Sequence, residues 1–379
     1  MSAKLKIING QVFGEQGTFM AAEVYACNER IVTKEAYDAA DGPETIVDAA
    51  GDYVIPGLTD IHFHGCMGSD CCDGTAEAFH TIARYELSQG VTSITPATMT
   101  MSEETLAKIC EAARDFSCPD GADFCGLYME GPFISIAKKG AQNERYIHPA
   151  DTPMLQRLQE ICGGKIRTAV IAPETEGAME FIRKNSGSIN ISLAHTTADY
   201  DTCMEAFLNG ASQLTHTYNA MPPFTHRAPG PIGAAADTDG CMAELICDGV
   251  HIHPAVVRAT FKLFGDDRII LISDSMRAAG MEDGTYDLGG QEVTVKGSLA
   301  TLSDGTIAGS VTNLMDCMRT AVKAMGIPLA SAVKCAAVNP VKAIGLMKDY
   351  GSLTPGRYAN IVLLKENLDL DKVIHRGVI

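Results

Sequence analysis

The sequence predicts an α/β protein: a (β/α)8 TIM-like barrel with a small β-sandwich domain that is built from both chain termini. Two observations lead to this fold. Short apolar, β-branched runs alternate with helical stretches through the middle of the 379 residues, whereas both ends of the chain read as β-type without helices. We therefore expect residues 1–54 and 350–379 to form the small β domain and residues 55–349 to form the barrel.

The two terminal segments share a pattern of short strands broken by turn residues. The expected strands of the N-terminal segment are Leu5–Ile8, Val12–Phe13, Glu23–Ala26 and Thr45–Val47. Those of the C-terminal segment lie within Tyr358–Leu364 and at Val373–Ile374. Both terminal segments have a β-type pattern that the middle of the chain does not share. We therefore expect the two segments to assemble into one small domain.

The middle of the chain supplies eight expected strands, which are Val54–Ile61, Val91–Thr95, Phe124–Met129, Ile166–Ile171, Ile189–Ala194, Ser212–Thr215, Met242–Cys247 and Ile269–Ser273. The expected helices between them include Thr75–Ser88, Glu103–Phe116, one that starts at Thr152, Asp199–Leu208 and Pro254–Phe264. Eight buried strands that alternate with helices are typical of a (β/α)8 barrel. A doubly wound open sheet should carry a glycine-rich phosphate loop after its first strand, and this sequence has none. We expect a β insertion at residues 286–310, after the eighth strand.

The composition argues against several classes of function. Lys and Arg number 30 against 47 Asp and Glu, and this net charge of −17 disfavours nucleic acid or an anionic membrane surface as a partner. No apolar run reaches the roughly 18 residues of a transmembrane helix, and the first residues lack the apolar region of a signal peptide. The 13 cysteines include no CxxC pair, which favours free thiols in a reducing cytoplasm.

Polar residues of metal-ligand type follow five of the expected strands. They are His62 and His64 after the first strand, Glu130 after the third, His195 after the fifth, His216 after the sixth and Asp274 after the eighth. Because the carboxyl ends of barrel strands form one ring at the active-site face, these six side chains should converge. Imidazole and carboxylate ligands together suit zinc, iron or another borderline divalent ion. The sequence therefore predicts a site for one or two divalent metal ions.

Several segments resemble the signatures of a known family. PGLTDIHFHG at 56–65 is similar to the first-strand signature of the amidohydrolase superfamily. GSLTPGRYAN at 351–360 is similar to its C-terminal signature, in which Asp is usual at the position of Asn360. Within the superfamily, essentially the whole chain resembles the N-acetylglucosamine-6-phosphate deacetylases. The matching segments are MEGPF at 129–133, AHT at 194–196, THTYNAM at 215–221 and SDSM at 273–276.

This resemblance implies roles for the site residues. Glu130, His195 and His216 match the metal ligands found throughout the family, and the two histidines after the first strand match a second metal position that some members keep. Asp274 matches the catalytic base. The residues that match contacts to the sugar phosphate are Ala141, Gln142, Asn219, Ala220, Arg227, His251, Ile307, Ala308 and Gly309. In the family the arginine reaches across a dimer interface, which implies a homodimer.

The implied reaction is hydrolysis of the acetamide of N-acetyl-D-glucosamine 6-phosphate to D-glucosamine 6-phosphate and acetate, in amino-sugar catabolism or recycling. A bound divalent ion lowers the pKa of water from about 15.7 toward 7. Asp274 would accept the proton of that water and pass it to the leaving nitrogen. For the phosphate, Asn219 and Ala220 can offer successive backbone N–H groups, and Arg227 can offer a bidentate fork.

Two alternatives stay open at this stage. Another metal-dependent amidohydrolase, such as a cyclic-amide hydrolase or a nucleobase deaminase, would use the same ring, but its substrates generally lack the phosphate that Arg227 suits. A catalytically inactive scaffold relative should have lost a ligand or the base, and this chain keeps all of them. The expected partners are therefore a small-molecule amino-sugar phosphate and a second copy of the chain, with no nucleic acid and no membrane, in the cytoplasm.

Overall fold

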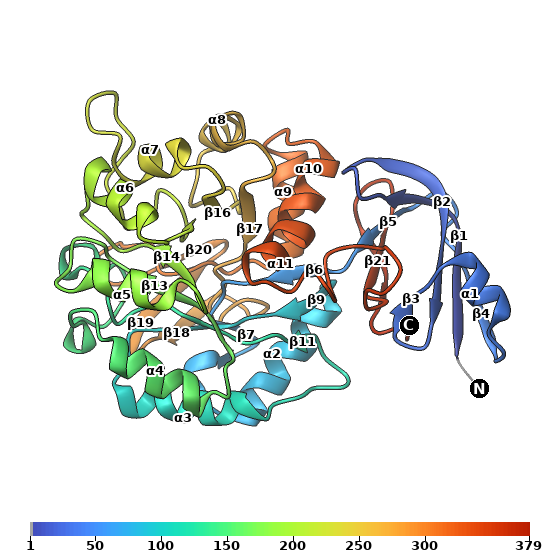
Figure 1. Ribbon diagram of the computed structural model, residues 1–379, viewed down its shortest axis with the longest axis horizontal. Coiled ribbons are helices and arrows are strands. Elements are labelled where there is room, and N and C mark those ends of the chain that lie inside the picture. The colour runs from blue at the N-terminus through green and yellow to red at the C-terminus, as the bar shows by residue number, and fades with distance from the viewer. Residues whose placement is uncertain (1–2) are drawn as a thin grey trace.

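The first and last strands of the chain pair in a small β domain at the right of Figure 1, which shows the computed structural model; residues 3–379 are described. Its strands are β1 (Lys4–Phe13), β2 (Phe19–Cys27), β3 (Arg30–Ile31), β4 (Glu44–Asp48), β5 (Tyr53–Pro56), β21 (Ile361–Leu364) and β22 (Leu370–Ile374), and helix α1 (Lys34–Ala39) precedes β4. The sheet order is β22-β21-β5-β1-β2-β3, and β4 pairs with the N-terminal half of β1. Because β4 and β5 share one edge of β1, the sheet branches, and side chains from both branches meet in one apolar core, as in a β-sandwich.

Parallel strands of the middle segment close into the barrel. They are β6 (Leu58–Asp60), β9 (Val91–Ile94) with β10 (Ala97–Thr98), β11 (Asp123–Phe124) with β12 (Leu127–Met129), β13 (Ile166–Ile171), β14 (Asn190–Leu193), β15 (Gln213–Leu214), β16 (Met242–Ile246) and β17 (Ile269–Ile272). Strands β12 to β17 pair consecutively, and β6, β9 and β11 form the adjoining sheet. Beyond β17 the backbone N–H of Asp274 donates to the His62 carbonyl at 3.0 Å, which joins the eighth strand to the first. The predicted fold class is confirmed.

One expected strand divides into two. The run Val54–Ile61 contains β5, which belongs to the small sheet, and β6, which belongs to the barrel, with Gly57 between them. A Cβ atom at position 57 would lie 2.2 Å from Oγ1 of Thr92 in β9, so only glycine lets the chain pass this close. The Gly57 N–H donates to the Asn360 carbonyl at 2.9 Å. The two segments that connect the small domain to the barrel are therefore tied to each other.

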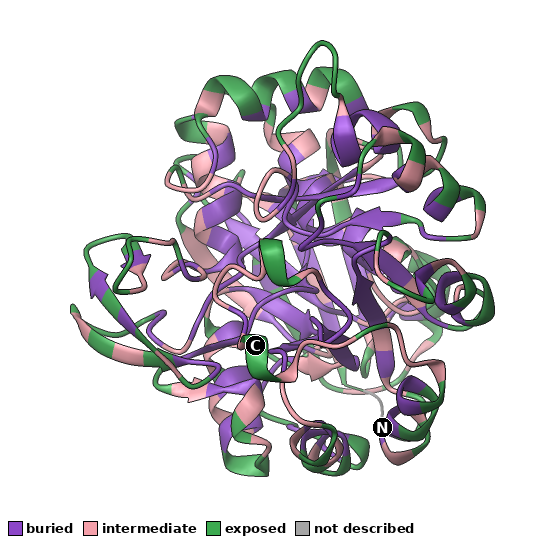
Figure 2. Cartoon of the chain, turned by 90° about the vertical axis from the view of Figure 1, so that its left-hand side faces the viewer, coloured by how far each residue is buried: buried purple, intermediate pink, exposed green. Residues whose placement is uncertain are grey.

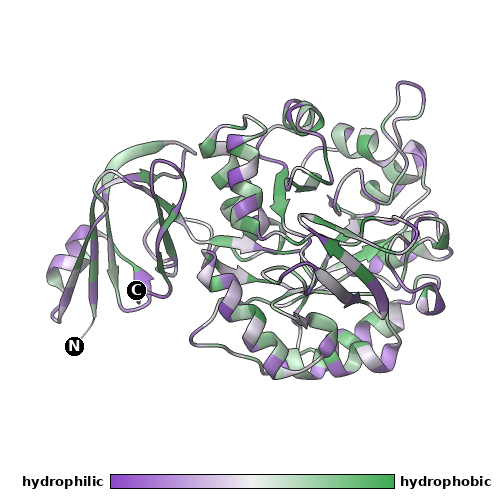
Figure 3. Ribbon diagram, turned by 180° about the vertical axis from the view of Figure 1, so that it is seen from behind, coloured by the Kyte–Doolittle hydropathy of each residue, from purple (hydrophilic) through white to green (hydrophobic). Residues whose placement is uncertain are grey.

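Helices cover the outside of the barrel. They are α2 (Ala76–Ser88), α3 (Glu103–Arg114), α4 (Thr152–Ile161), α5 (Ala178–Asn185), α6 (Tyr200–Leu208), α7 (Gly230–Asp237), α8 (Pro254–Phe264), α9 (Leu314–Lys323), α10 (Leu329–Val333) and α11 (Asn339–Ala343), with a π-helical turn at Lys334–Val338. Figure 2 shows buried central strands inside a shell of helices with exposed outer faces. In Figure 3 the helices mix hydrophobic and hydrophilic residues, the pattern of a helix with one buried face.

A three-stranded antiparallel sheet follows β17, at the position of the expected insertion. Its strands are β18 (Gly284–Leu288), β19 (Gln291–Lys296) and β20 (Leu299–Thr301). Leu288 and Val293 pack with Met99 and Met276 of the barrel, so the insertion sits on the face where the barrel strands end. The shorter elements near this face are β7 (Gly65–Cys66), β8 (Ser69–Asp70) and 3-10 turns at Cys71–Asp73, Ile136–Lys138 and Glu144–Tyr146. None of the helices within residues 3–379 combines the length and the hydropathy needed to cross a lipid bilayer.

Candidate metal centre and active site

A cavity of about 390 Å³ lies at the carboxyl ends of the barrel strands. The six residues of metal-ligand type predicted from the sequence, called the ring residues below, gather here. Five of them line the cavity, and the sixth, His62, lies behind them and is fully buried. The insertion contributes Leu288 to the rim, and the loop after β20 contributes Thr306 and Ile307. The carboxyl-end position and the ligand-type lining together make this cavity the candidate active site.

One oxygen of Glu130 faces two of the histidines. Its Oε1 atom lies 2.9 Å from Nε2 of His195 and 3.0 Å from Nε2 of His216, and the two Nε2 atoms are 3.1 Å apart. All three residues are buried, and their ligand atoms lie within 4.8 Å of one another. This is the spacing of a site that can hold one divalent cation.

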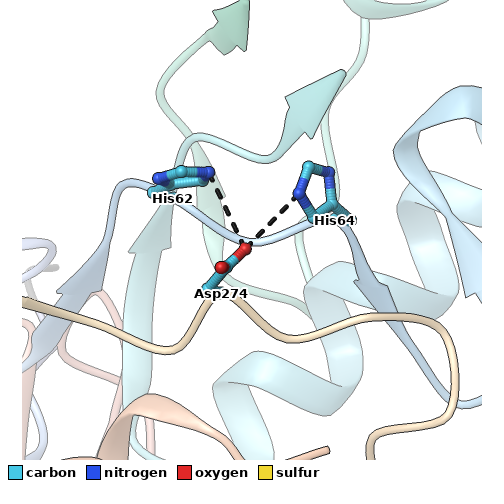
Figure 4. A group of neighbouring side chains, drawn as sticks. All are labelled: His62, His64 and Asp274. Carbon is cyan, nitrogen blue, oxygen red and sulfur yellow. Dashed lines mark ion pairs between the residues drawn. The ribbon is translucent and has the colours of Figure 1, made fainter. Parts of the chain in front are cut away.

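The other oxygen of Glu130 faces the histidines that follow β6. Its Oε2 atom lies 3.1 Å from Nε2 of His64 and 3.7 Å from Nε2 of His62. Both of these nitrogens also point at Asp274, whose Oδ1 lies 3.4 Å from His64 Nε2 and 3.8 Å from His62 Nε2 (Figure 4). Glu130 therefore stands between two groups of ligand-type atoms, in a position to bridge them.

The donor set fits a divalent metal. Within residues 3–379, Nε2 of His62 and Oε2 of Glu130 are fully buried and have no hydrogen-bond partner. Unpaired polar atoms are costly in a protein interior unless a further ligand satisfies them. Imidazole and carboxylate are the donors that zinc and iron accept. The candidate metal groups at this cavity are thus His62–His64–Asp274 and Glu130–His195–His216.

The outer ring nitrogens of three histidines are held by partners behind the site. Nδ1 of His64 is 3.3 Å from the Ala97 carbonyl, and Nδ1 of His195 is 2.8 Å from the Lys138 carbonyl. A carbonyl can only accept, so each Nδ1 carries a proton, and in the neutral ring that a metal ligand requires each Nε2 is the nitrogen that presents its lone pair to the cavity. Nδ1 of His62 instead meets the carboxylate of Glu244 at 2.8 Å. Sequence analysis did not identify Glu244, and its one signal was a charge in the middle of an apolar strand.

Three of the ring residues have left-handed backbone conformations. The φ angles are 44° at His195, 29° at His216 and 48° at Asp274. Such angles are unfavourable for residues other than glycine and persist where the surrounding structure imposes them, commonly at functional sites. Each of the three residues lies just beyond a barrel strand, and the turn there leaves its side chain in the ring.

The two ring carboxylates are held in the ionised form. Burial raises the pKa of Glu130, but its hydrogen bonds to His195 and His216 outweigh burial and hold this pKa well below its usual value. Burial also raises the pKa of Asp274, but the hydrogen bond to His64 and the nearby imidazole charges lower it overall. Both groups are therefore anionic at neutral pH, as metal ligands and a general base must be.

The expected sugar-phosphate residues lie in different surroundings. Those that line the cavity are Ala141, Gln142, Asn219, Ala220, His251, Ile307 and Gly309. Ala308 is fully buried behind the lining, against Met276. The backbone N–H and the side-chain amide of Asn219 both donate to the His216 carbonyl, at 2.9 and 3.1 Å, so the expected pair of free backbone N–H groups is incomplete in this conformation. Arg227 is exposed in the loop before α7, outside the cavity of its own chain.

A larger cavity, of about 960 Å³, lies at the junction between the small domain and the barrel, and no ring residue lines it. Near it, His80 Nδ1 lies 3.1 Å from Sγ of Cys118, and this thiol lies 3.4 Å from Oδ1 of Asp120. The other carboxylate oxygen of Asp120 pairs with Arg84 at 2.8 Å. These contacts satisfy one another, so we assign the group a structural role.

Comparison with known proteins gives consistent matches. The sequence profile of the amidohydrolase family matches residues 53–379. The N-acetylglucosamine-6-phosphate deacetylase of Bacillus subtilis (strain 168) is 36% identical over 334 residues, which cover 86% of this chain and 84% of that protein. The N-acetylgalactosamine-6-phosphate deacetylase of Escherichia coli O157:H7 is 32% identical over 338 residues, which cover 88% of this chain and 89% of that protein.

Solved structures match over the whole chain. A mutant N-acetyl-D-glucosamine-6-phosphate deacetylase from Mycobacterium smegmatis, in complex with N-acetyl-D-glucosamine-6-phosphate, has a TM-score of 0.89 at 28% identity and covers 99% of this chain and 98% of its own. The N-acetylglucosamine-6-phosphate deacetylase from Thermotoga maritima has a TM-score of 0.86 at 30% identity, and 98% of each chain is covered.

Proposed function

The chain belongs to the amidohydrolase family, and we propose that it hydrolyses the acetamide of N-acetyl-D-glucosamine 6-phosphate to D-glucosamine 6-phosphate and acetate. The observation that carries the proposal is the convergence of four imidazoles and two carboxylates at one cavity of about 390 Å³. The relative from B. subtilis and the structure from M. smegmatis are deacetylases of this substrate, which supports the same reaction here. The product fits amino-sugar catabolism or recycling.

The proposal includes one or two divalent ions, with zinc or iron as the metal. Glu130, His195 and His216 would hold the first ion, and His62 and His64, with the second oxygen of Glu130, would hold the other. When bound, such an ion lowers the pKa of water from about 15.7 toward 7 and polarises the acetyl carbonyl. The unpartnered buried atoms of the ring support this assignment.

Asp274 would act first as a general base and then as a general acid. Its Oδ1 atom faces the ring, 3.4 Å from His64 Nε2, and its pKa lies below the usual value. It accepts the proton of the attacking water and donates this proton to the amide nitrogen as the C–N bond breaks. The proton therefore ends on the glucosamine nitrogen, and no covalent intermediate with the protein forms.

The phosphate would be bound by cationic groups of two chains. His251 lines the cavity, and its Nδ1 pairs with Asp248 at 2.7 Å. Burial lowers the pKa of His251, but the Asp248 contact outweighs it, so the net shift favours the imidazolium. Arg227 lies outside the cavity of its own chain, which supports a homodimer in which it reaches the partner's cavity. Short-range cations of this kind would bind a dianion despite the net charge of −17.

A cytoplasmic location is also part of the proposal. All of the cysteines, from Cys27 to Cys335, are free thiols in the structure. Free thiols persist in reducing compartments, whereas oxidising ones favour disulfides. The substrate, a phosphorylated sugar, is typical of the same compartment.

The test is acetate release by the purified chain. We expect release from N-acetyl-D-glucosamine 6-phosphate that far exceeds release from unphosphorylated N-acetylglucosamine, with N-acetylgalactosamine 6-phosphate as a third substrate. Dialysis against a chelator should abolish the activity, and added zinc or ferrous ion should restore it. Cleavage of cyclic amides without a phosphate preference would instead support another amidohydrolase, and a metal-loaded chain without any activity would support an inactive relative.

A further inference from the structure

Glu244 is a charged residue in the apolar interior of the barrel. It is the middle residue of β16, and its neighbours on the same face of the strand, Met242 and Ile246, pack against β17 residues such as Ile270. Its side chain is fully buried. A carboxylate in such a place is costly unless specific partners satisfy it, so its contacts indicate why the fold retains it.

The partners of Glu244 are parts of the two ligand groups. Its Oε2 atom lies 2.8 Å from Nδ1 of His62 and accepts the backbone N–H of His216 at 3.0 Å. Its Oε1 atom accepts from the Gln213 side chain at 2.5 Å, and the Gln213 oxygen accepts in turn from Asn190 at 2.8 Å. Oε2 of Glu244 therefore contacts one residue of each candidate metal group, whereas Oε1 is held by Gln213 of the neighbouring strand β15.

The contact with His62 determines how this ring faces the site. A carboxylate accepts, so Nδ1 of His62 donates to Glu244, and in the neutral ring that a metal ligand requires Nε2 is the nitrogen whose lone pair faces Glu130 and Asp274. The His62 ring also stacks on Tyr128, with ring centroids 4.3 Å apart and an angle of 13° between the planes. Stacking fixes the plane of the ring, and Glu244 fixes its rotation within that plane and its tautomer.

The contact with His216 acts on the backbone. His216 has a φ of 29°, and Glu244 accepts the N–H of this residue. Within residues 3–379, Nδ1 of His216 is buried and has no hydrogen-bond partner. Among the described residues, no group behind the His216 ring fixes its tautomer in the way that carbonyls do for His64 and His195. The backbone contact with Glu244 is therefore a main restraint on where this side chain enters the site.

From these contacts we propose that Glu244 is a positioning residue that couples the two metal positions. It holds the His62 ring for one ion and the His216 backbone for the other, so the occupancy of each position depends on the same carboxylate. The inference deepens the proposed function and rests on the metal centre assigned there. Residues that orient metal ligands from behind are typically worth about 10–100-fold in metal affinity.

The test measures metal affinity and ion count in the Glu244→Gln variant, without an activity assay. Glutamine keeps the shape but removes the charge that His62 and His216 share. We expect the affinity for the ion at His62 and His64 to fall by about 10–100-fold in chelator competition. Elemental analysis should then find fewer zinc ions per chain than in wild type at the same chelator concentration. Glu86→Gln is the matched control, because Glu86 is also a fully buried barrel carboxyl but contacts no ligand residue.

Repeating the measurement in a second variant, His62→Asn, distinguishes a positioning role of Glu244 from a general structural role. In His62→Asn the ion at His62 and His64 is already weakened, so adding Glu244→Gln should change only the affinity at His195 and His216. An effect on that remaining ion reports the His216 contact. If Glu244→Gln does not fold, Glu244→Asp, which keeps the charge but withdraws the carboxylate, should weaken the same ion.

The outcomes distinguish this inference from the proposed function. A wild-type chain that binds no divalent ion overturns the metal centre itself. A wild-type chain that binds metal while folded Glu244→Gln binds it equally well overturns only the role of Glu244. Equal losses of apo-protein stability in both backgrounds, with unchanged metal affinity, would give Glu244 a purely structural role.

Discussion

Asp274 is the residue whose replacement should separate chemistry from metal binding. Asparagine keeps the size of the side chain but cannot accept a proton, so Asp274→Asn should lower kcat by about 10²–10⁴, the usual contribution of a general base. Glu130, His195 and His216 remain, so the variant should retain the ion that they hold. Steady-state kinetics with elemental analysis of the same sample checks both statements. Near-normal turnover would place the base elsewhere.

At the scale of single residues, the sequence predicted those site residues that directly follow a recognisable strand. His195, His216 and Asp274 each follow an apolar run, and a barrel brings such positions together. Glu244 was missed because it stands inside a strand, where the apolar neighbours dominate the pattern. Arg227 was placed near the phosphate by resemblance alone, and in the structure it lies in an exposed loop and does not line the cavity of its own chain.

At the scale of the element, helix α2 carries an acid without a partner. Glu86 is fully buried, and neither of its carboxylate oxygens has a hydrogen-bond partner within residues 3–379. Burial raises the pKa of Glu86 well above 4.5, and the nearby Asp60 adds to this shift. The folded state therefore keeps this proton at pH values where the unfolded chain has released it, and the contribution of Glu86 to stability falls as the pH rises above about 4.5.

Replacing Glu86 by Gln removes this dependence on pH. The difference in Tm between Glu86→Gln and wild type should become more positive between pH 5 and pH 8, because only wild type is penalised by ionisation of the unfolded chain. Thermal unfolding at three pH values measures it. Glu111→Gln, on the exposed face of α3, is the control and should show a small and nearly constant difference. A constant difference for Glu86→Gln would mean that Glu86 is ionised in the folded protein.

The periodicity of the sequence located the elements but not every point where the chain changes sheets. The run Val54–Ile61 reads as one apolar strand, yet β5 and β6 belong to different domains. The break depends on Gly57 and its close approach to Thr92, a tertiary contact that a pattern of hydropathy does not contain. The β insertion was easier to predict, since a Gly289–Gly290 turn marks it within the sequence itself.

At the scale of the whole molecule, Arg227 should act on the partner's substrate. A bidentate contact to phosphate is worth about 1.5–3 kcal/mol, so Arg227→Ala should lower kcat/KM for the 6-phosphate by roughly ten- to a hundredfold. Unphosphorylated N-acetylglucosamine should be affected little. Mixing Arg227→Ala chains with inactive Asp274→Asn chains should restore activity, because the hybrid dimer has one site with both residues.

The control for this mixing experiment is the double variant Asp274→Asn with Arg227→Ala. Mixed with Arg227→Ala, it supplies no arginine and should restore nothing. Equal losses on both substrates in Arg227→Ala would assign the residue to the fold or to dimer formation. If the double variant restored the activity of Arg227→Ala chains, the second chain would act by a route other than supplying Arg227.

The junction between the two domains gives a prediction about stability. Nδ2 of Asn360 donates to Asp123 at 3.1 Å, and Arg376 and His375 contact the same carboxylate at 2.8 and 3.2 Å. The family signature usually has Asp at this position, but here Asn360→Asp would place two carboxylates together. We expect a loss of about 1–3 kcal/mol in the free energy of unfolding at neutral pH. The loss should shrink as the pH falls and the new carboxyl regains a proton.

Denaturant unfolding at two pH values checks this expectation. Asn367→Asp is the control, because Asn367 makes a similar contact to Asp369 at 2.7 Å but is exposed. Its effect should stay within about 0.5 kcal/mol. An equally small effect for Asn360→Asp would show that Arg376 and His375 are sufficient to hold Asp123 and that the asparagine is not required at the junction.

The position of β5 between β1 and β21 has a consequence for synthesis of the protein. On the ribosome, β5 emerges before the whole barrel, and its partner β21 is among the last strands to be translated. Until then one edge of β5 is open, and its residues Val54 and Ile55, which are fully buried in the finished fold, lack their cover. A nascent chain that stalls before Ile361 therefore exposes the unpaired, apolar edge of β5 to chaperones and proteases. This edge is covered only after β21 has been translated and has paired with β5.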